Sequence, residues 1–397
     1  MFHEFDGARM GHAAGLRRSG DAADRVLTAA GFAEAAAEIA AWEGYAPTPL
    51  FELDALAGAL GLATVLYKDE GPRFGLGSFK ALGGAYAALL VLRQEMSGAL
   101  GRPVSPADIR EGRYAALASR ITLVTATDGN HGRSLAWGCR RFGAACRIYI
   151  HAGVSEARAE AMRALGAEVI RIDGNYDDSV RLSREEAEAN GWFAVSDTSW
   201  PGYIETPRDV MAGYGVMVKE VSDALDRPPT HAFLQAGVGG LAAAVAAGLR
   251  QRWGGASPRI VVVEPELAAC LFESARAGGM TDIRIEEETL MAGLSCGEPS
   301  ALAWEVLAEE AGDFLTVPES FVGPAMRLLA RPPGSDPKIE AGESAVAGLA
   351  ALIAAARSDT MRPLLGLDEG ARVLLIGSEG ATDPESYAAV MGARGGD

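Results

Sequence analysis

The residue whose surroundings point most directly to chemistry is Lys80, which lies in the run FGLGSFKALGG at residues 74–84. Its neighbours in the chain are apolar, so we expect its side chain to be partly removed from water. Loss of water disfavours the ammonium form, lowers the pKa of a lysine and leaves an amine that can attack an aldehyde. The same sequence is also compatible with a lysine that begins a helix and keeps its ammonium group in water. Lys80 is therefore a candidate nucleophile whose assignment depends on other segments.

A second segment, TDGNHG at residues 127–132, follows a predicted strand and begins a predicted helix. Its glycines allow tight turns, and the N–H groups at a helix start can hold an anion such as a carboxylate. Asn130 can donate a hydrogen bond to a ring oxygen. The same sequence is also typical of an ordinary Asp-Gly turn followed by a helix N-cap.

Two further strand ends carry small or hydroxyl residues. GVGG at residues 237–240 does not have the spacing of a dinucleotide-binding loop, and no acid that could bind a ribose follows about 20 residues later. A glycine nest at a helix start suits one phosphate monoester, although such turns also serve packing alone. Ser378 follows the last predicted strand, where its hydroxyl could hydrogen-bond a neutral pyridine nitrogen or simply form a turn.

The elements that must position these residues alternate between strand and helix. Apolar, β-branched runs predict strands at 121–127, 146–150, 168–172, 231–235, 260–264 and 372–376, and helices are expected at 131–142, 155–165, 177–190 and 241–250. This alternation predicts an α/β protein with two open, mostly parallel sheets flanked by helices. We expect a large discontinuous domain at 1–88 and 208–397, a small α/β domain at 89–207, and the active site in the cleft between them.

Composition excludes several classes of partner. The chain has 397 residues and a net charge of −17, which repels phosphate backbones, so we expect no nucleic-acid or membrane partner. Residues 1–18 lack an apolar core of signal-peptide length, and we expect a cytoplasmic protein. The scattered histidines and cysteines show no metal-ligand spacing, so no metal site is predicted. Free thiols are expected, although Cys270 and Cys296 could pair if their loops meet.

From about Tyr45 to Tyr387, the chain resembles the fold type II pyridoxal-phosphate enzymes, which are the tryptophan synthase β-like group. The resemblance rests on four features in this order: SFKALGG, TDGNHG, GVGG and the serine at the end of the last strand. GVGG alone is weakly specific, whereas the ordered set is strongly specific. Within this group, five blocks look like those of the diaminopropionate ammonia-lyase family: RFGLGSFKALGGAYA (73–87), TATDGNHGRSLAW (125–137), SDTSWPGY (196–203), MAGLSCGEPS (291–300) and SEGATDP (378–384).

The resemblance implies pyridoxal 5′-phosphate as cofactor, bound by the large domain. Lys80 would bond the cofactor's aldehyde and Asn130 would contact its O3′. Ser378 would face the pyridine nitrogen, with Thr382 as a competing candidate. The cofactor's phosphate would be held by Gly237, Val238, Gly239 and Gly240.

The resemblance also implies the substrate's contacts. Asp128 stands where most relatives have serine, and it would be a second acid/base on the face opposite Lys80. Asp197 would help bind the substrate's distal amine. The substrate's carboxylate would rest on the N–H groups from Thr127 through Gly129 to His131, while the side chain of His131 is expected to pack.

The activity implied is a lyase of amino-acid catabolism that eliminates ammonia from D- and L-2,3-diaminopropionate and yields pyruvate and ammonia. The alternative is a serine or threonine dehydratase, of either hand, on the same scaffold. A non-catalytic binding module would have no need of the amine of Lys80. The family resemblance also implies a homodimer.

Overall fold

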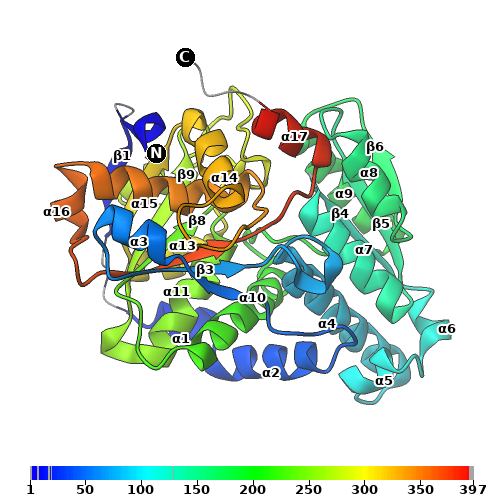
Figure 1. Cartoon of the computed structure of the whole chain (residues 1–397). Helices are drawn as coiled ribbons and strands as arrows, with labels where there is room; N and C mark the ends of the chain where they lie inside the picture. Colours follow the sequence, from blue (N-terminus) through cyan, green and yellow to red (C-terminus); the bar gives the residue numbers. More distant parts are fainter. Residues whose placement is uncertain (1, 7–8, 17, 19, 128, 393–397) are drawn as a thin grey trace. The chain divides into compact units, whose positions relative to one another are not determined.

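The computed structural model describes residues 2–6, 9–16, 18, 20–127 and 129–392. The chain divides into two compact units, each built around its own sheet (Figure 1). The first unit comprises residues 1–29, 46–78 and 217–397, and the second comprises residues 30–45 and 79–216. Both sheets are mostly parallel and flanked by helices, which confirms the predicted fold class.

In the described part of the first unit, seven strands form one sheet in the order β1-β10-β9-β8-β11-β3-β2. The pairs from β10 to β3 are parallel, whereas the edge strands β1 and β2 are antiparallel to their neighbours. Strands covered on both faces need continuous apolar runs, such as residues 260–263. The strands are β1 (Gly11–Ala14), β2 (Leu50–Glu52), β3 (Thr64–Asp69), β8 (His231–Gln235), β9 (Arg259–Pro265), β10 (Ala311–Val317) and β11 (Arg372–Gly377).

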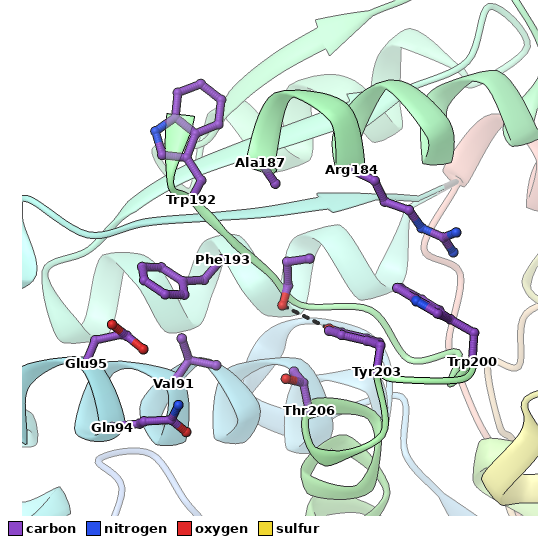
Figure 2. Close-up of a pocket in the computed structure, with 11 residues that line it drawn as sticks. Val91, Gln94, Glu95, Arg184, Ala187, Trp192, Phe193, Trp200, Tyr203 and Thr206 are labelled. Atoms are coloured by element: carbon purple, nitrogen blue, oxygen red, sulfur yellow. Dashed lines mark hydrogen bonds between the residues drawn. The ribbon is translucent and has the colours of Figure 1, made fainter. Parts of the chain in front are cut away.

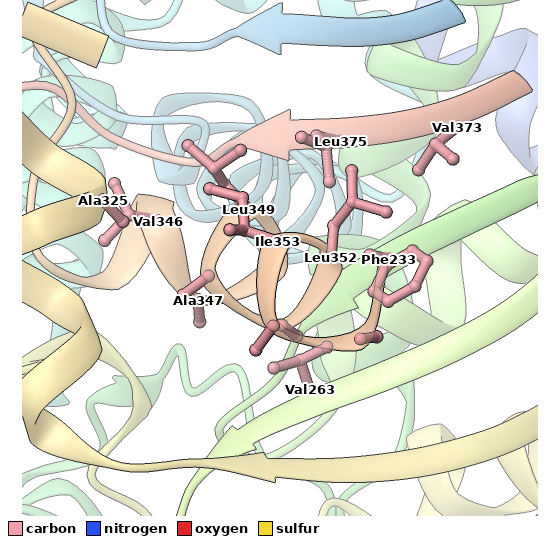
Figure 3. Packing of buried hydrophobic residues seen from close by; sticks show 14 of the residues in the cluster. Phe233, Val263, Ala325, Val346, Ala347, Leu349, Leu352, Ile353, Val373 and Leu375 are labelled. Atoms are coloured by element: carbon pink, nitrogen blue, oxygen red, sulfur yellow. The ribbon is translucent and has the colours of Figure 1, made fainter. Parts of the chain in front are cut away.

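The core of this unit is built around helix α15 (Ala347–Arg357), which is buried from Ala347 to Ala356. Figure 3 shows Leu349, Leu352 and Ile353 of α15 among side chains of the strands, including Phe233 of β8 and Leu375 of β11. The helix approaches β8 closely at Gly348, where an added Cβ would lie 2.9 Å from the Phe233 carbonyl oxygen. The unit's other helices are α1 (Ala22–Val26), α3 (Asp54–Leu60), α11 (Gly240–Trp253), α12 (Cys270–Ala277), α13 (Ala301–Glu310), α14 (Val322–Ala330), α16 (Met361–Leu365) and α17 (Pro384–Gly392).

In the described part of the second unit, four parallel strands form a sheet in the order β6-β5-β4-β7. They are β4 (Thr122–Ala126), β5 (Ala145–Ile150), β6 (Glu168–Arg171) and β7 (Phe193–Ala194). The helices are α2 (Ala29–Ala40), α4 (Lys80–Leu100), α5 (Pro106–Arg110), α6 (Ala115–Ala118), α7 (Asn130–Phe142), α8 (Glu156–Arg163), α9 (Tyr176–Asn190) and α10 (Glu205–Ala224), whose last residues belong to the first unit.

The strands predicted at 121–127 and 372–376 are β4 and β11, and the strand predicted at 231–235 is β8. Strand β10 was not predicted, because Asp313 interrupts its apolar run. In the folded chain this carboxylate is buried and accepts hydrogen bonds from Arg259 on β9 at 2.6 and 2.9 Å. Among the described helices, none is both long and apolar enough to cross a lipid bilayer.

Candidate active site

Lys80 is the first residue of α4, and the two glycines that follow it fix the helix against its neighbours. A Cβ added at Gly83 would lie 2.5 Å from the ring of Tyr214 on α10. A Cβ at Gly84 would lie 2.7 Å from the hydroxyl of Ser134 on α7. Real Cβ contacts are not this short, so residues without a side chain allow α4 to pack closely and hold Lys80 in place.

The ammonium of Lys80 is paired with the carboxylate of Asp197, and 19% and 18% of the two side chains are exposed. The Lys80 nitrogen also lies 5.3 Å from the ring centre of Phe79 and 5.9 Å from that of Tyr214. The negative faces of aromatic rings attract a cation at this range. Lys80 and Asp197 are 117 positions apart in the sequence, and the family resemblance assigned both to one site. In the structure their side chains are in contact.

Burial alone would raise the pKa of Asp197, but the positive charge of Lys80 and its hydrogen bond lower it, and the pKa lies well below its usual range. Asp197 is therefore ionised at neutral pH. A carboxylate in this state, partly shielded from water, is suited to hold a primary ammonium group.

His131 is buried on α7, and its Nε2 donates a hydrogen bond to the carbonyl oxygen of Val195 at 2.8 Å. This bond assigns the proton to Nε2. Its Nδ1 lies 3.9 Å from a carboxylate oxygen of Asp197. Burial lowers the pKa of His131, against the opposing charge of Asp197, so the ring is neutral. The side chain joins the start of α7 to the segment that carries Asp197.

The turn before α7 already uses two of its N–H groups. The Thr127 N–H donates to the Tyr149 carbonyl oxygen, and the Gly129 N–H donates to the Thr127 hydroxyl, each at 3.1 Å. The N–H of Gly129 would have to leave the hydroxyl to hold a substrate carboxylate. Helix α7 begins at Asn130, and the first N–H groups of any helix lack acceptors within it. Asp128, the predicted second acid/base, lies outside the described residues.

The GVGG loop joins β8 to α11 in the first unit, and its shape fits a phosphate. Gly239 has φ +99°, which side-chain-bearing residues rarely adopt. A Cβ on Gly237 would lie 3.0 Å from the Cys296 sulfur and 3.1 Å from the Leu294 Cα. The loop thus presents backbone at the N-terminus of α11, and Val238 in its middle is partly exposed. Such a backbone nest suits a dianionic phosphate monoester.

The two candidates for a pyridine nitrogen also lie in the first unit. Ser378 is buried directly after β11, while Thr382 is partly exposed and its N–H donates to the Gly380 carbonyl oxygen at 2.8 Å. All four cysteines, which are among the described residues, are free thiols. The Cys270 sulfur is 3.6 Å from the Gly237 carbonyl oxygen, so it packs against the GVGG loop.

A buried cluster of charges that sequence reasoning missed precedes Lys80 in the chain. The guanidinium of Arg73 donates to Glu70 and to Glu220, with both carboxylates bound through two oxygens at 2.8 Å. Lys68 donates to Glu220 at 2.5 Å and to the Thr48 carbonyl oxygen at 2.7 Å. The four charges balance, which a buried cluster requires.

This cluster anchors the segment that leads to Lys80. Immediately after Arg73, Phe74 has φ +51°, the one such non-glycine residue in the described chain. Gly77 follows with φ +78°, and its carbonyl oxygen accepts the Gly380 N–H at 2.9 Å. An unusual backbone persists only where its surroundings hold it. The apolar neighbours of Lys80 gave no sign of this cluster, because Glu220 lies 147 residues from Arg73.

This chain is similar in sequence and in structure to known pyridoxal-phosphate-dependent enzymes. Residues 41–378 match the family model described as "Pyridoxal-phosphate dependent enzyme". The diaminopropionate ammonia-lyase of Escherichia coli strain K12 is 38% identical over 358 residues, which cover 88% of each chain. Two crystal structures of the Escherichia coli enzyme, one with an aminoacrylate-PLP azomethine reaction intermediate and one with D-serine, match at TM-scores of 0.87 and 0.86. These two are 36% and 34% identical to this chain, and each match covers 96% of both chains. The chain therefore belongs to the pyridoxal-phosphate-dependent enzymes and, within them, to the diaminopropionate ammonia-lyase family.

Proposed function

We propose that this protein is a lyase that eliminates the β-amino group of D- and L-2,3-diaminopropionate and yields pyruvate and ammonia, with pyridoxal 5′-phosphate as its cofactor. The observation that carries the proposal is the ion pair between Lys80 and Asp197. It places a carboxylate that binds a primary ammonium beside the proposed catalytic lysine. A primary ammonium is the group that distinguishes diaminopropionate from serine.

The cofactor contacts that we propose are those that the family resemblance implies. Lys80 would bond the cofactor's aldehyde, and Asn130 would contact its O3′. Either Ser378 or Thr382 would donate a hydrogen bond to its pyridine nitrogen. The backbone of the loop from Gly237 through Val238 and Gly239 to Gly240 would hold its phosphate. When bound, this cofactor withdraws electrons from the substrate's Cα and acidifies the Cα–H bond.

Two bases would serve the two enantiomers. Lys80 takes the Cα proton on one face of the substrate, and Asp128 takes it on the opposite face. The carboxylate of the substrate would rest on the N–H groups at the start of α7, those of Gly129 and His131 included, with the Thr127 hydroxyl beside them. Each base contributes roughly 10²- to 10⁴-fold to the rate.

Asp197 would hold the β-ammonium in its charged form until it leaves as ammonia. The protonated β-amine leaves as neutral ammonia and takes the electron pair of the C–N bond with it, so it loses no proton and Asp197 stays ionised. The remaining three-carbon enamine hydrolyses in water to pyruvate and a second ammonia. One substrate and one water thus give one pyruvate and two ammonia molecules.

A serine or threonine dehydratase remains the second candidate, because the Escherichia coli relative has been crystallised with D-serine. A hydroxyl leaving group would not need an ionised Asp197. The two functions separate when pyruvate release is measured with D- and L-diaminopropionate and with D- and L-serine. We expect a much higher kcat/KM for the diamines, and a higher value for serine would overturn the proposal.

We further propose a cytoplasmic homodimer. The family resemblance supports the dimer, and the free cysteines support a reducing compartment. Light scattering on the purified protein would measure twice the mass of the chain, and a monomer mass would reject the dimer.

A further inference from the structure

A tight turn follows Asp197 in the sequence Trp200-Pro201-Gly202-Tyr203. The N–H of Tyr203 donates to the Trp200 carbonyl oxygen at 2.9 Å, and the N–H of Trp200 donates to the Tyr203 carbonyl oxygen at 3.2 Å. Proline suits the second position of a type II turn, and glycine suits the third, which requires a positive φ. Gly202 has φ +87°. The turn reverses the chain and returns Tyr203 to the end of β7.

The two aromatic rings of the turn contact each other and a charged side chain. Trp200 and Tyr203 stack with ring centres 4.1 Å apart and planes 16° apart. The guanidinium of Arg184 on α9 lies 3.7 Å from the centre of the Trp200 ring. Figure 2 shows Arg184, Trp200 and Tyr203 along one side of a cavity of about 420 Å³. Stacking and a cation over the ring face both stabilise the observed positions of these side chains.

The hydroxyl of Tyr203 joins backbone groups on both sides of Val195. It donates to the Ala194 carbonyl oxygen at 2.9 Å, the bond drawn in Figure 2, and it accepts the Ser196 N–H at 2.9 Å. The side chain of Thr206 also hydrogen-bonds this hydroxyl. Burial raises the pKa of Tyr203 to about 12, so the hydroxyl keeps its proton at neutral pH.

These contacts fix the start of the segment that carries Asp197. Ser196 is the residue directly before Asp197, and its hydroxyl accepts the Thr198 N–H at 3.2 Å. On the other side, the Val195 carbonyl oxygen accepts the bond from His131. Asp197 itself lies between β7 and α10, in a connecting segment, where backbone freedom is greatest. A hydroxyl that bonds residues 194 and 196 removes much of this freedom.

We propose that Tyr203 is a positioning residue that holds the carboxylate of Asp197 where it receives the substrate's β-ammonium. This inference rests on the proposed function, because it deepens the role given to Asp197. The turn thus contributes to specificity for a diamine, because it positions the carboxylate that binds the β-ammonium. Tyr203 acts through the backbone of Ser196, and Asp197 makes the contact with the substrate.

The direct test is Tyr203→Phe in the cofactor-loaded enzyme. The substitution keeps the ring and its stacking on Trp200 but removes the bonds to residues 194 and 196. We expect the KM for D- and L-2,3-diaminopropionate to rise about tenfold, as the loss of buried hydrogen bonds allows Asp197 to shift. The dissociation constant of D-serine, measured from the absorbance of the bound cofactor, should change less than about twofold, because serine has no β-ammonium.

Two further variants control for general effects of the substitution. Tyr149→Phe removes a tyrosine hydroxyl that bonds Glu186 on α9, and it should leave both constants unchanged. Gly202→Ala adds a Cβ with no other atom within 4 Å, so it acts only through the positive φ. It should raise the KM for the diamines in the same direction as Tyr203→Phe. Thermal unfolding of each variant confirms that it is folded.

The outcomes separate this inference from the function on which it rests. If Asp197→Asn raises the KM for the diamines and Tyr203→Phe does not, the positioning role is wrong and the proposed function stands. If Tyr203→Phe weakens the diamines and D-serine equally, the tyrosine only maintains the fold and the inference is overturned. If Asp197→Asn itself leaves the preference for the diamine unchanged, the role of Asp197 fails, and the role of Tyr203 fails with it.

Discussion

Replacing Asp197 with asparagine removes the charge of the proposed amine site and keeps its shape. The structure gives two reasons to expect a selective effect. Asp197 is ionised, because the charge of Lys80 outweighs the effect of burial on the pKa of this carboxyl group. Its carboxylate already binds a primary ammonium, that of Lys80. An asparagine can still accept a hydrogen bond, but it cannot attract a cation.

The size of the effect follows from the kind of contact that is lost. A hydrogen bond to a charged group contributes about 1.5–3 kcal/mol, and about 1.4 kcal/mol corresponds to a factor of ten. Because 18% of the Asp197 side chain is exposed, water screens part of the attraction, and the lower part of this range applies. We therefore expect kcat/KM for 2,3-diaminopropionate to fall about 10- to 50-fold, and kcat/KM for serine to change little.

The assay measures pyruvate release through a coupled dehydrogenase, with D- and L-diaminopropionate and with D-serine. The visible spectrum of the bound cofactor must stay unchanged, which shows that Lys80 still holds it. Asp173→Asn, an exposed acid in the same unit, is the control for the change in net charge. Equal losses on the diamines and on D-serine, or no loss on the diamines, would refute the reasoning.

Three other substitutions test separate parts of the account. Asp128→Asn should reduce turnover of D-diaminopropionate by roughly 10²- to 10⁴-fold and that of the L isomer far less, and equal losses would reject the two-base model. Arg73→Met leaves Glu70 and Glu220 buried without their guanidinium, so urea unfolding should show a loss of about 3–5 kcal/mol, and a loss under about 1 kcal/mol would contradict the anchoring role. Burial raises the pKa of Glu264 from 4.5 to about 8, so the folded chain holds a proton that the unfolded chain releases. Stability should then fall as the pH rises between these values, Glu264→Gln should remove that part of the slope, and an unchanged slope would contradict it.

The sequence was sufficient to predict the strand ends that carry the site, because each combines an apolar run with glycine and polar residues at its end. Asn130 and Ser378 come after predicted strands that the structure contains, and Thr127, predicted as the last residue of a strand, directly follows β4. Sequence reasoning could also link Lys80 with Asp197 through the family resemblance. It could not derive their pairing from the residues, because nothing local relates positions 80 and 197.

The rest of the site depends on contacts between distant residues. The partners of Arg73 include Glu220, and no pattern near either residue indicates the other. Tyr203 differs, because Pro201-Gly202 is a local turn signal that could have been used. The signal predicts the turn but not which backbone groups the tyrosine hydroxyl will bond. The position of those backbone groups depends on the pairing of β7 with β4, which no local pattern shows.

The central claim is that the amine of Lys80 covalently holds the cofactor's aldehyde. Borohydride reduction of the cofactor-loaded enzyme, followed by peptide mass spectrometry, tests it most directly. We predict that the mass of the reduced cofactor stays on the peptide that contains Lys80, and that Lys80→Ala folds normally but loses both the adduct and the visible band. A colourless protein, or an adduct on another lysine, would contradict the account.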